Sequence, residues 1–185
     1  MTVAIALIRG INVGGKHRLP MSTLRSLCEK LGWKDVATLL QSGNVVFRCA
    51  ERALVGVARK LEEAVEVECG FRAGVVVRSH DEVRAMVAAN PFASKRGLEP
   101  NKLLVMFLAA APDTGASKAL AALKAHPEEL VLKGREHFMY YPDGVGQSKL
   151  PFTAVERALK VSGTTRNWNT VTKLLTMAGD LESAD

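Results

Sequence analysis

The first 90 residues alternate between two kinds of apolar pattern. Short continuous apolar runs are typical of buried strands, and longer stretches with apolar residues three or four positions apart are typical of amphipathic helices. The runs predict strands at residues 3–8, 36–40, 45–47 and 74–78. The longer spacing predicts helices at residues 20–31, 51–68 and 79–89. This order, β-α-β-β-α-β, predicts a ferredoxin-like α/β plait within an α+β fold.

A similar series of elements begins after residue 101. The predicted strands are residues 102–108, 130–133 and 137–141, and the predicted helices are residues 114–125, 151–161 and 165–178. The order β-α-β-β recurs, so we interpret this half as an incomplete or modified second plait that ends in helices. Residues 91–101 are rich in turn-forming and charged residues, which predicts a linker. The expected domains are therefore residues 1–90 and 102–185.

The connections in the first plait predict where its loops lie. A crossover helix makes strands 3–8 and 36–40 parallel, so both strands end at the same edge of the sheet. The hairpin that follows then starts strand 45–47 at that edge. We therefore expect the loop at residues 9–20 to lie beside the turn at residues 41–44, provided that strand 45–47 borders strand 3–8.

Charge is distributed unevenly along the chain. The net charge is +6, and residues 1–50 hold seven Lys and Arg against two Asp and Glu. Such an excess favours anionic partners, either phosphorylated small molecules or nucleic acid, although a solvated basic surface would have the same composition. Aromatic residues make up 5% of the chain, and no strand carries the aromatic pattern of an RNA-recognition motif.

Other features of the composition bear on compartment and cofactors. The three cysteines have no metal-ligand or redox spacing, which predicts a reduced, cytoplasmic protein. No apolar run is long enough to span a membrane, and no leader pattern precedes the first strand. The four histidines also lack metal-ligand spacing, so we expect neither a metal nor a cofactor.

The loop after the first strand carries the most suggestive chemistry. Residues 10–16 fit the P-loop spacing G-x-x-x-x-G-K between a strand and a helix. His17 stands where a P-loop has Ser or Thr, the helix begins late, and no Walker B aspartate follows a strand, so a nucleotide triphosphatase is not expected. A looser anion-binding loop and a purely structural connection both fit. The candidate ligand-binding residues of the loop are Arg9, Asn12, Gly14, Gly15 and Lys16.

Four further residues are candidates for the same site. Ser42 and Asn44 could supply donors from the neighbouring turn, although turn geometry alone explains such residues. Lys149 lies in a second glycine-rich loop, at residues 144–149, which is either another anion site or a turn before a helix. Arg166 opens the last predicted helix, where a cation is unfavourable, so we expect a carboxylate or a bound anion beside it.

Three motifs together resemble a known family. They are residues 7–21 (LIRGINVGGKHRLPM), 41–45 (QSGNV) and 165–170 (TRNWNT). The chain is similar across nearly its whole length to the bacterial family catalogued as domain of unknown function 1697. The resemblance implies a two-part α/β plait and implies no established activity.

Three functions therefore remain open at this point. The chain is a binding protein for a phosphorylated small molecule or nucleotide, a nucleic-acid-binding module, or an enzyme that acts on a phosphorylated substrate through groups that the sequence does not identify. The oligomeric state is equally open.

Overall fold

The computed structural model describes residues 1–50, 54–123 and 125–184. These residues contain six α-helices and eight strands, and the strands form two four-stranded antiparallel sheets. The fold is therefore a mixed one of the α+β class. Two compact units make up the chain: residues 1–87 together with 172–185 form the first, and residues 88–171 form the second.

The first unit contains a sheet with the strand order β2-β3-β1-β4. Its elements are β1 (Thr2–Ile8), α1 (Met21–Lys30), β2 (Lys34–Leu39), β3 (Asn44–Cys49), α2 (Leu54–Cys69), β4 (Val75–Ser79) and α3 (His80–Ala88). The helix α6 (Trp168–Ser183) contributes its residues from Thr172 onward. β3 borders β1, with Asn44 opposite Leu7. The condition for the predicted meeting of loop and turn is therefore confirmed.

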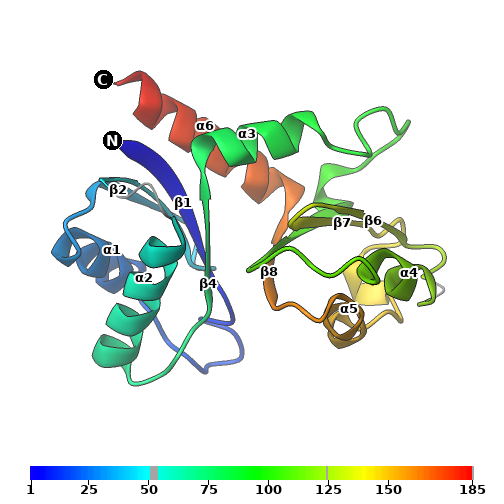
Figure 1. Ribbon diagram of the computed structural model, residues 1–185, viewed down its shortest axis with the longest axis horizontal. Helices are drawn as coiled ribbons and strands as arrows, with labels where there is room; N and C mark the ends of the chain where they lie inside the picture. Colours follow the sequence, from blue (N-terminus) through cyan, green and yellow to red (C-terminus); the bar gives the residue numbers. More distant parts are fainter. Residues whose placement is uncertain (51–53, 124, 185) are drawn as a thin grey trace. The chain divides into compact units, whose positions relative to one another are not determined.

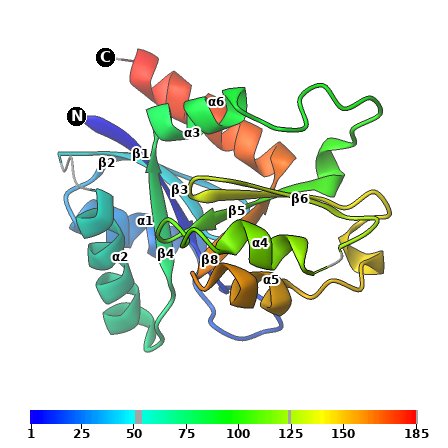
Figure 2. The same cartoon turned by 45° about the vertical axis from the view of Figure 1, so that its right-hand side comes forward.

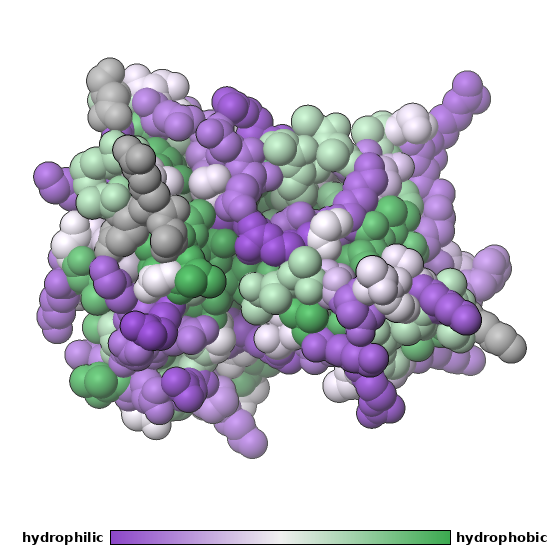
Figure 3. Space-filling view, in the orientation of Figure 1, coloured by the Kyte–Doolittle hydropathy of each residue, from purple (hydrophilic) through white to green (hydrophobic). Residues whose placement is uncertain are grey.

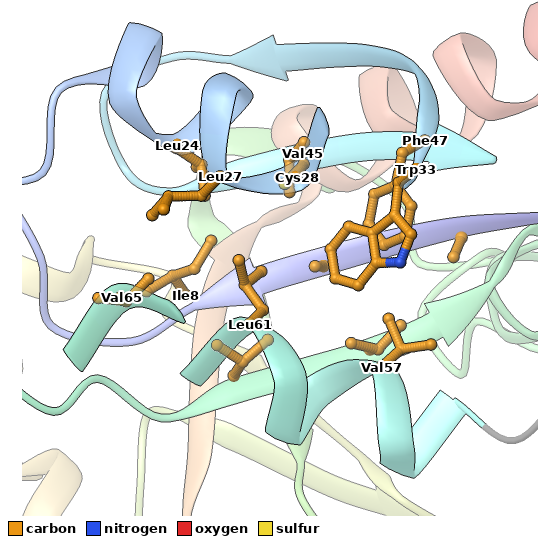
Figure 4. Packing of buried hydrophobic residues seen from close by; sticks show 14 of the residues in the cluster. Ile8, Leu24, Leu27, Cys28, Trp33, Val45, Phe47, Val57, Leu61 and Val65 are labelled. Carbon is orange, nitrogen blue, oxygen red and sulfur yellow. The ribbon is translucent and has the colours of Figure 1, made fainter. Parts of the chain in front are cut away.

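Helices α1 and α2 cover one face of this sheet (Figure 1). Figure 4 shows Leu24 and Leu27 of α1 and Leu61 of α2 in one cluster with the apolar side chains of the strands, among them Val45 and Phe47 of β3. Trp33 stacks on Phe47, with the ring centroids 4.2 Å apart. Burying each such side chain stabilises the folded state by about 1.5–3 kcal/mol. The apolar residues that recur at helical spacing in the sequence are thus the ones that pack against the sheet.

The opposite face of the sheet carries buried cations as well as apolar residues. Alternation along β3 directs Val45 and Phe47 to the helices and Arg48 to the other face. Arg48 donates from its guanidinium to the carbonyl oxygen of Leu181 near the end of α6, and it pairs with Asp35 at 3.1 Å. A cation at a helix C-terminus satisfies the last carbonyls and the negative end of the helix dipole. Arg48 thus fastens the end of α6 to the sheet.

The second unit contains a sheet with the equivalent strand order, β6-β7-β5-β8. Its elements are β5 (Leu103–Leu108), α4 (Ala116–Ala121), β6 (Glu129–Lys133), β7 (Glu136–Tyr140), α5 (Phe152–Leu159) and β8 (Gly163–Asn167). Met106, Met139 and Val155 are members of a core cluster between the sheet and the helices α4 and α5. The sequence predicted an incomplete or modified second half with no strand between its last two helices, and the absence of that strand was wrong, because β8 supplies the fourth strand of the sheet.

The missed strand lies where the sequence predicted the start of the last helix. Thr164 and Thr165 are β-branched and favour an extended backbone, and Arg166 pairs with Val105 of β5 across the ladder. The helix begins only at Trp168, after Asn167 accepts a hydrogen bond from the backbone N–H of Thr170 at 3.2 Å. Asn167 is a typical N-cap residue. The polar run at residues 164–167 therefore marks an edge strand and a cap.

The segment at residues 91–101 packs on the second unit through several side chains. Phe92 is buried, with its ring 6.0 Å from that of Tyr140, and Lys95 pairs with Glu129 at 2.7 Å.

Hydrophilic side chains project over much of the visible surface (Figure 3). Among the described helices, none combines the length and the apolar composition needed to cross a bilayer.

Candidate anion-binding loop

The loop at residues 9–20 is anchored as soon as it leaves β1. The backbone N–H of Ile8 donates to Gly43 at 2.8 Å, and that of Arg9 donates to Gly74 at 2.8 Å. The first bond ties the end of β1 to the turn before β3, and the second ties it to the connection between α2 and β4. The loop therefore starts between two other connections at the same edge of the sheet.

Asn12 holds the middle of the loop. Its amide nitrogen donates to the carbonyl oxygens of Leu19 at 2.9 Å and Gln41 at 2.8 Å, and its amide oxygen accepts from the N–H of Leu19 at 2.9 Å. The backbone of Asn12 is left-handed, with φ of 56°, which asparagine tolerates better than most residues. Both amide hydrogens are committed to the fold, so we expect Asn12 to position the loop and not to contact a ligand.

Gly14 and Gly15 form the tip of the loop. The N–H of Lys16 donates to Val13 at 3.2 Å, and the two glycines have φ of 60° and 73°. Positive φ at both central positions is the type I′ turn, which favours glycine. Both glycines are exposed, and neither backbone N–H donates to another described residue. The turn explains the glycines structurally and leaves two adjacent amide donors facing solvent.

The cations of the loop lie on the surface. Arg9, Lys16 and Arg18 are exposed, and within the described residues neither Lys16 nor Arg18 forms an ion pair. The first acidic residue of the chain is Glu29. His17 stacks on Phe71, with ring centroids 4.7 Å apart, and so joins the loop to the connection before β4. The loop thus combines a fixed backbone with two cations, Lys16 and Arg18, that no described carboxylate neutralises.

The turn beside the loop is structural in its detail. Asn44 is fully buried, and its amide nitrogen donates to Leu39 at 2.8 Å and to the hydroxyl of Ser42 at 2.9 Å. At Gly43 φ is 75°, and a Cβ there would lie 2.7 Å from Ile11 Cδ1 and 2.9 Å from Ile8 Cβ. Only glycine fits this position without movement of its neighbours. Asn44 and Gly43 shape the edge, while Ser42 is exposed on it.

Lys149 belongs to the second unit. It is exposed and lines a cavity of about 310 Å³, together with the aromatic ring of Tyr141 and the polar side chains of His126, Glu128 and Ser148. The hydroxyl of Ser148 is bonded to the carboxylate of Glu128 and also accepts from the N–H of Leu150 at 3.0 Å. Ser148 therefore ties the glycine-rich loop to Glu128 and to the residue that follows the loop.

Arg166 also belongs to the second unit, and the expectation that it opens a helix was wrong. It lies on β8, 8% exposed, and donates to the hydroxyl of Thr164 at 2.7 Å and the carbonyl of Thr165 at 2.9 Å. Burial lowers the pKa of its guanidinium to about 10, so the group stays protonated at neutral pH. Arg166 is thus a buried charge on a sheet.

Comparison with known proteins follows from this geometry. The family model described as "Protein of unknown function (DUF1697)" matches residues 1–138. The chain belongs to this family. The resemblance predicted from the three motifs is confirmed, and two of the motifs lie within the matched residues. The match therefore includes both the loop at residues 9–20 and the turn beside it.

Known structures extend the comparison beyond the matched residues. The solved structure of conserved bacterial protein SP0830 from Streptococcus pneumoniae is 23% identical to this DUF1697 chain, with a TM-score of 0.72, and the likeness covers 96% of this chain and 98% of that one. A search of curated proteins gives no match. These comparisons support the fold and the family.

Several contacts at this site have no signal in the sequence. The ring stack of His17 on Phe71 joins residues far apart in the chain, and no pattern predicts it. The sequence also does not predict the packing of Gly43 against Ile11, because a Ser-Gly-Asn turn has the same sequence whether or not a loop packs on it. What the sequence did predict is that the loop lies beside the turn, because the order of elements implies it when β3 borders β1.

Proposed function

We propose that this DUF1697 protein binds the phosphate group of a small molecule or nucleotide at the loop of residues 9–18. The observation that carries the proposal is a loop whose backbone is fixed by the hydrogen bonds of Asn12 to Leu19 and Gln41, while its cations Lys16 and Arg18 have no ion-pair partner among the described residues. A preorganised loop spends little conformational entropy on binding an anion.

The tip of the loop supplies a second kind of donor. The exposed amides of Gly14 and Gly15 are adjacent to Lys16, and successive backbone N–H groups with nearby cations suit phosphate oxygens. Asn12 and Asn44 would act indirectly, because their amide groups are bonded within the chain. Arg9 and Ser42 are exposed at the same edge and would complete the contact surface.

A titration with matched variants tests this site. Inorganic phosphate, pyrophosphate, nucleotides and sugar phosphates are titrated into the wild type and into the double variant Lys16→Gln with Arg18→Gln. Loss of two charge-assisted contacts should weaken binding about tenfold or more, given roughly 1.5–3 kcal/mol for each bond to a charged group. The control is Lys118→Gln with Arg157→Gln, which removes the same charge from exposed positions of the second unit.

The control separates a site from general basicity. Equal weakening in both double variants would contradict the proposal and indicate attraction to net charge alone. Short oligonucleotides form a further arm of the same titration. Tight oligonucleotide binding with a steep dependence on salt, and no selectivity among small phosphates, would favour the nucleic-acid function instead.

We further propose that each unit is a ferredoxin-like plait, as the order of strands and helices in each supports. The element order β-α-β-β-α-β with the first strand in the sheet interior is the split βαβ arrangement.

A reducing, cytoplasmic environment is also proposed. In its favour, Cys28, Cys49 and Cys69 are all free thiols, and burial raises the pKa of Cys28 to about 12, which keeps it an unreactive thiol.

A further inference from the structure

Three potential metal ligands meet where α3 and α6 lie side by side (Figures 1 and 2). His80 and Asp81 begin α3, directly after β4, and Glu182 lies in the last turn of α6. One ligand atom from each residue, the imidazole Nδ1 and two carboxylate oxygens, lies within 4.8 Å of the others. All three residues belong to the first unit.

The imidazole of His80 is oriented by its surroundings. The residue is 8% exposed, and its Nδ1 contacts the carboxylate of Glu182. Its other edge lies beneath α6, because a Cβ built on Gly179 would be 3.6 Å from Nε2 and 3.9 Å from Cε1. Nδ1 is therefore the ring nitrogen on the side of the carboxylates. The ring is held and the ligand nitrogen points to the cluster.

The two carboxylates are free to adapt. The side chains of Asp81 and Glu182 are 70% and 50% exposed, so small rotations could bring their oxygens closer to Nδ1. Neither is needed to cap α3, since Ser79 and Glu82 form a reciprocal capping box with bonds of 3.1 and 2.8 Å. The attraction for a cation therefore comes from the two carboxylates, because Arg48 already occupies the carbonyl of Leu181 at the end of α6 and the start of α3 is the positive end of its dipole.

We propose that His80, Asp81 and Glu182 bind one divalent transition-metal ion of the Zn²⁺ class. One imidazole nitrogen and two carboxylate oxygens are ligands that zinc uses, and three protein ligands leave a fourth position for water or an anion. The ion would replace the direct contact of His80 with Glu182 and join the start of α3 to the end of α6. This site is independent of the phosphate site at residues 9–18.

Arg84 is the competitor for this ion. It pairs with Asp81 at 2.6 Å, and its charge would oppose a cation beside that carboxylate. Removal of the competitor should therefore strengthen metal binding. The variant Arg84→Gln gives the proposal a test in which a substitution raises affinity. The variant must be shown to be folded, because an unfolded chain would expose the free thiols of Cys28, Cys49 and Cys69 to Zn²⁺.

The test is calorimetric titration of Zn²⁺ into the full-length chain after treatment with a chelator. We expect one ion per chain in the wild type, at least tenfold weaker binding in Glu182→Gln, and tighter binding in Arg84→Gln. The control is Asp180→Asn, which removes the same charge from an exposed position of the same helix and should bind as the wild type does. Saturating Zn²⁺ should raise the melting temperature by about 5–10 °C at a hundredfold excess over Kd.

Two results would overturn the proposal. The first is a wild type that takes up no stoichiometric Zn²⁺, which would leave His80 and Glu182 as an ion pair between two helices. The second is equal affinity in the wild type, Glu182→Gln and Arg84→Gln, which would assign the bound ion to other groups. Circular dichroism of each variant establishes that it is folded, so a negative result counts against the site.

Discussion

The two units have equivalent strand orders, yet the loops that follow their first strands carry opposite chemistry. In the first unit, residues 9–20 hold Arg9, Lys16 and Arg18 and no carboxylate. In the second, residues 109–115 are short and contain Asp113, which accepts from the N–H of Gly115 at 2.9 Å and pairs with Lys160 at 3.4 Å. The same topology therefore supports a loop with two cations, Lys16 and Arg18, that form no ion pair with a described residue, and an equivalent loop whose carboxylate is paired.

The cores of the two units differ as well. The core cluster of the first unit is made of apolar residues and cysteine. In the second, β7 places His137 between Met106 and Leu132, fully buried, and neither ring nitrogen makes a hydrogen bond of ordinary geometry with a described residue. The first unit thus carries its cations on the surface loop and on the far face of its sheet, while the second has an imidazole in its core layer.

The largest expected effect comes from the turns that join the second and third strands of each sheet. Gly43→Ala should destabilise the first unit by roughly 2–5 kcal/mol, the sum of a left-handed backbone penalty and overpacking against Ile8 and Ile11. Gly134, at the equivalent turn of the second unit, has φ of 58° and open space around it. Gly134→Ala should therefore cost about 1–2 kcal/mol. Chemical denaturation measures the free energy of unfolding of both variants. An equal loss in Gly43→Ala and Gly134→Ala would refute close packing at residue 43.

The next effect is a pH dependence confined to the second unit. Burial lowers the pKa of His137 to about 4 from its usual 6.5, and the backbone of Val131 offsets only part of the shift. Above pH 6.5 the imidazole is neutral whether folded or unfolded, and between pH 6.5 and 4 the unfolded chain gains a proton that the folded one resists. Stability should therefore fall by roughly 3 kcal/mol over that interval.

A substitution isolates the histidine from the other groups that titrate there. His137→Leu should flatten the stability of the second unit between pH 6.5 and 4 and leave the acid response of the first unit unchanged. Amide hydrogen exchange resolves the two units separately, since each opens with its own free energy. A wild-type slope that persists in His137→Leu would assign the pH dependence to other residues.

The smallest effect concerns the loop that distinguishes the units. Asn12→Ala removes two hydrogen bonds to Leu19 and one to Gln41, and it should cost about 1–3 kcal/mol because polar backbone groups lose their partner. Phosphate binding should weaken with it, although Asn12 touches no ligand in the proposal. Asp113→Ala, in the equivalent loop, removes exposed contacts and should cost less than about 1 kcal/mol. Similar costs for both variants would contradict a special role for Asn12.

Much of the fold follows from the spacing of apolar residues, and the failures have physical causes. The strand 3–8 and the helix 20–31 were predicted because burial imposes their period on the sequence. Residues 165–167 were assigned to a helix because threonine and asparagine serve both caps and edge strands, and only the ladder with β5 decides between them. The mistaken place of Arg166 follows from that single ambiguity.

The sequence identified which residues lie in the loop and the turn of the candidate site, but it did not identify what each side chain does there. Topology brings residues 9–20 beside residues 41–44, and the structure has this proximity through Asn12 and Gln41. The sequence could not tell that Asn12 and Asn44 use their amides within the chain, because a hydrogen-bond partner leaves no local pattern. His80 and Glu182 were equally invisible, since they are separated by 102 positions.

The division of α6 between the units has a consequence for how the molecule is made. Residues 88–171 form one unit, while the other draws on both residues 1–87 and residues 172–185. The carbonyl of Leu181, which accepts from Arg48 of β3, is therefore synthesised only after every residue of the second unit. The unit that begins first in the chain is therefore completed last, because Arg48 lacks this partner until residues 172–185 have folded back on the sheet.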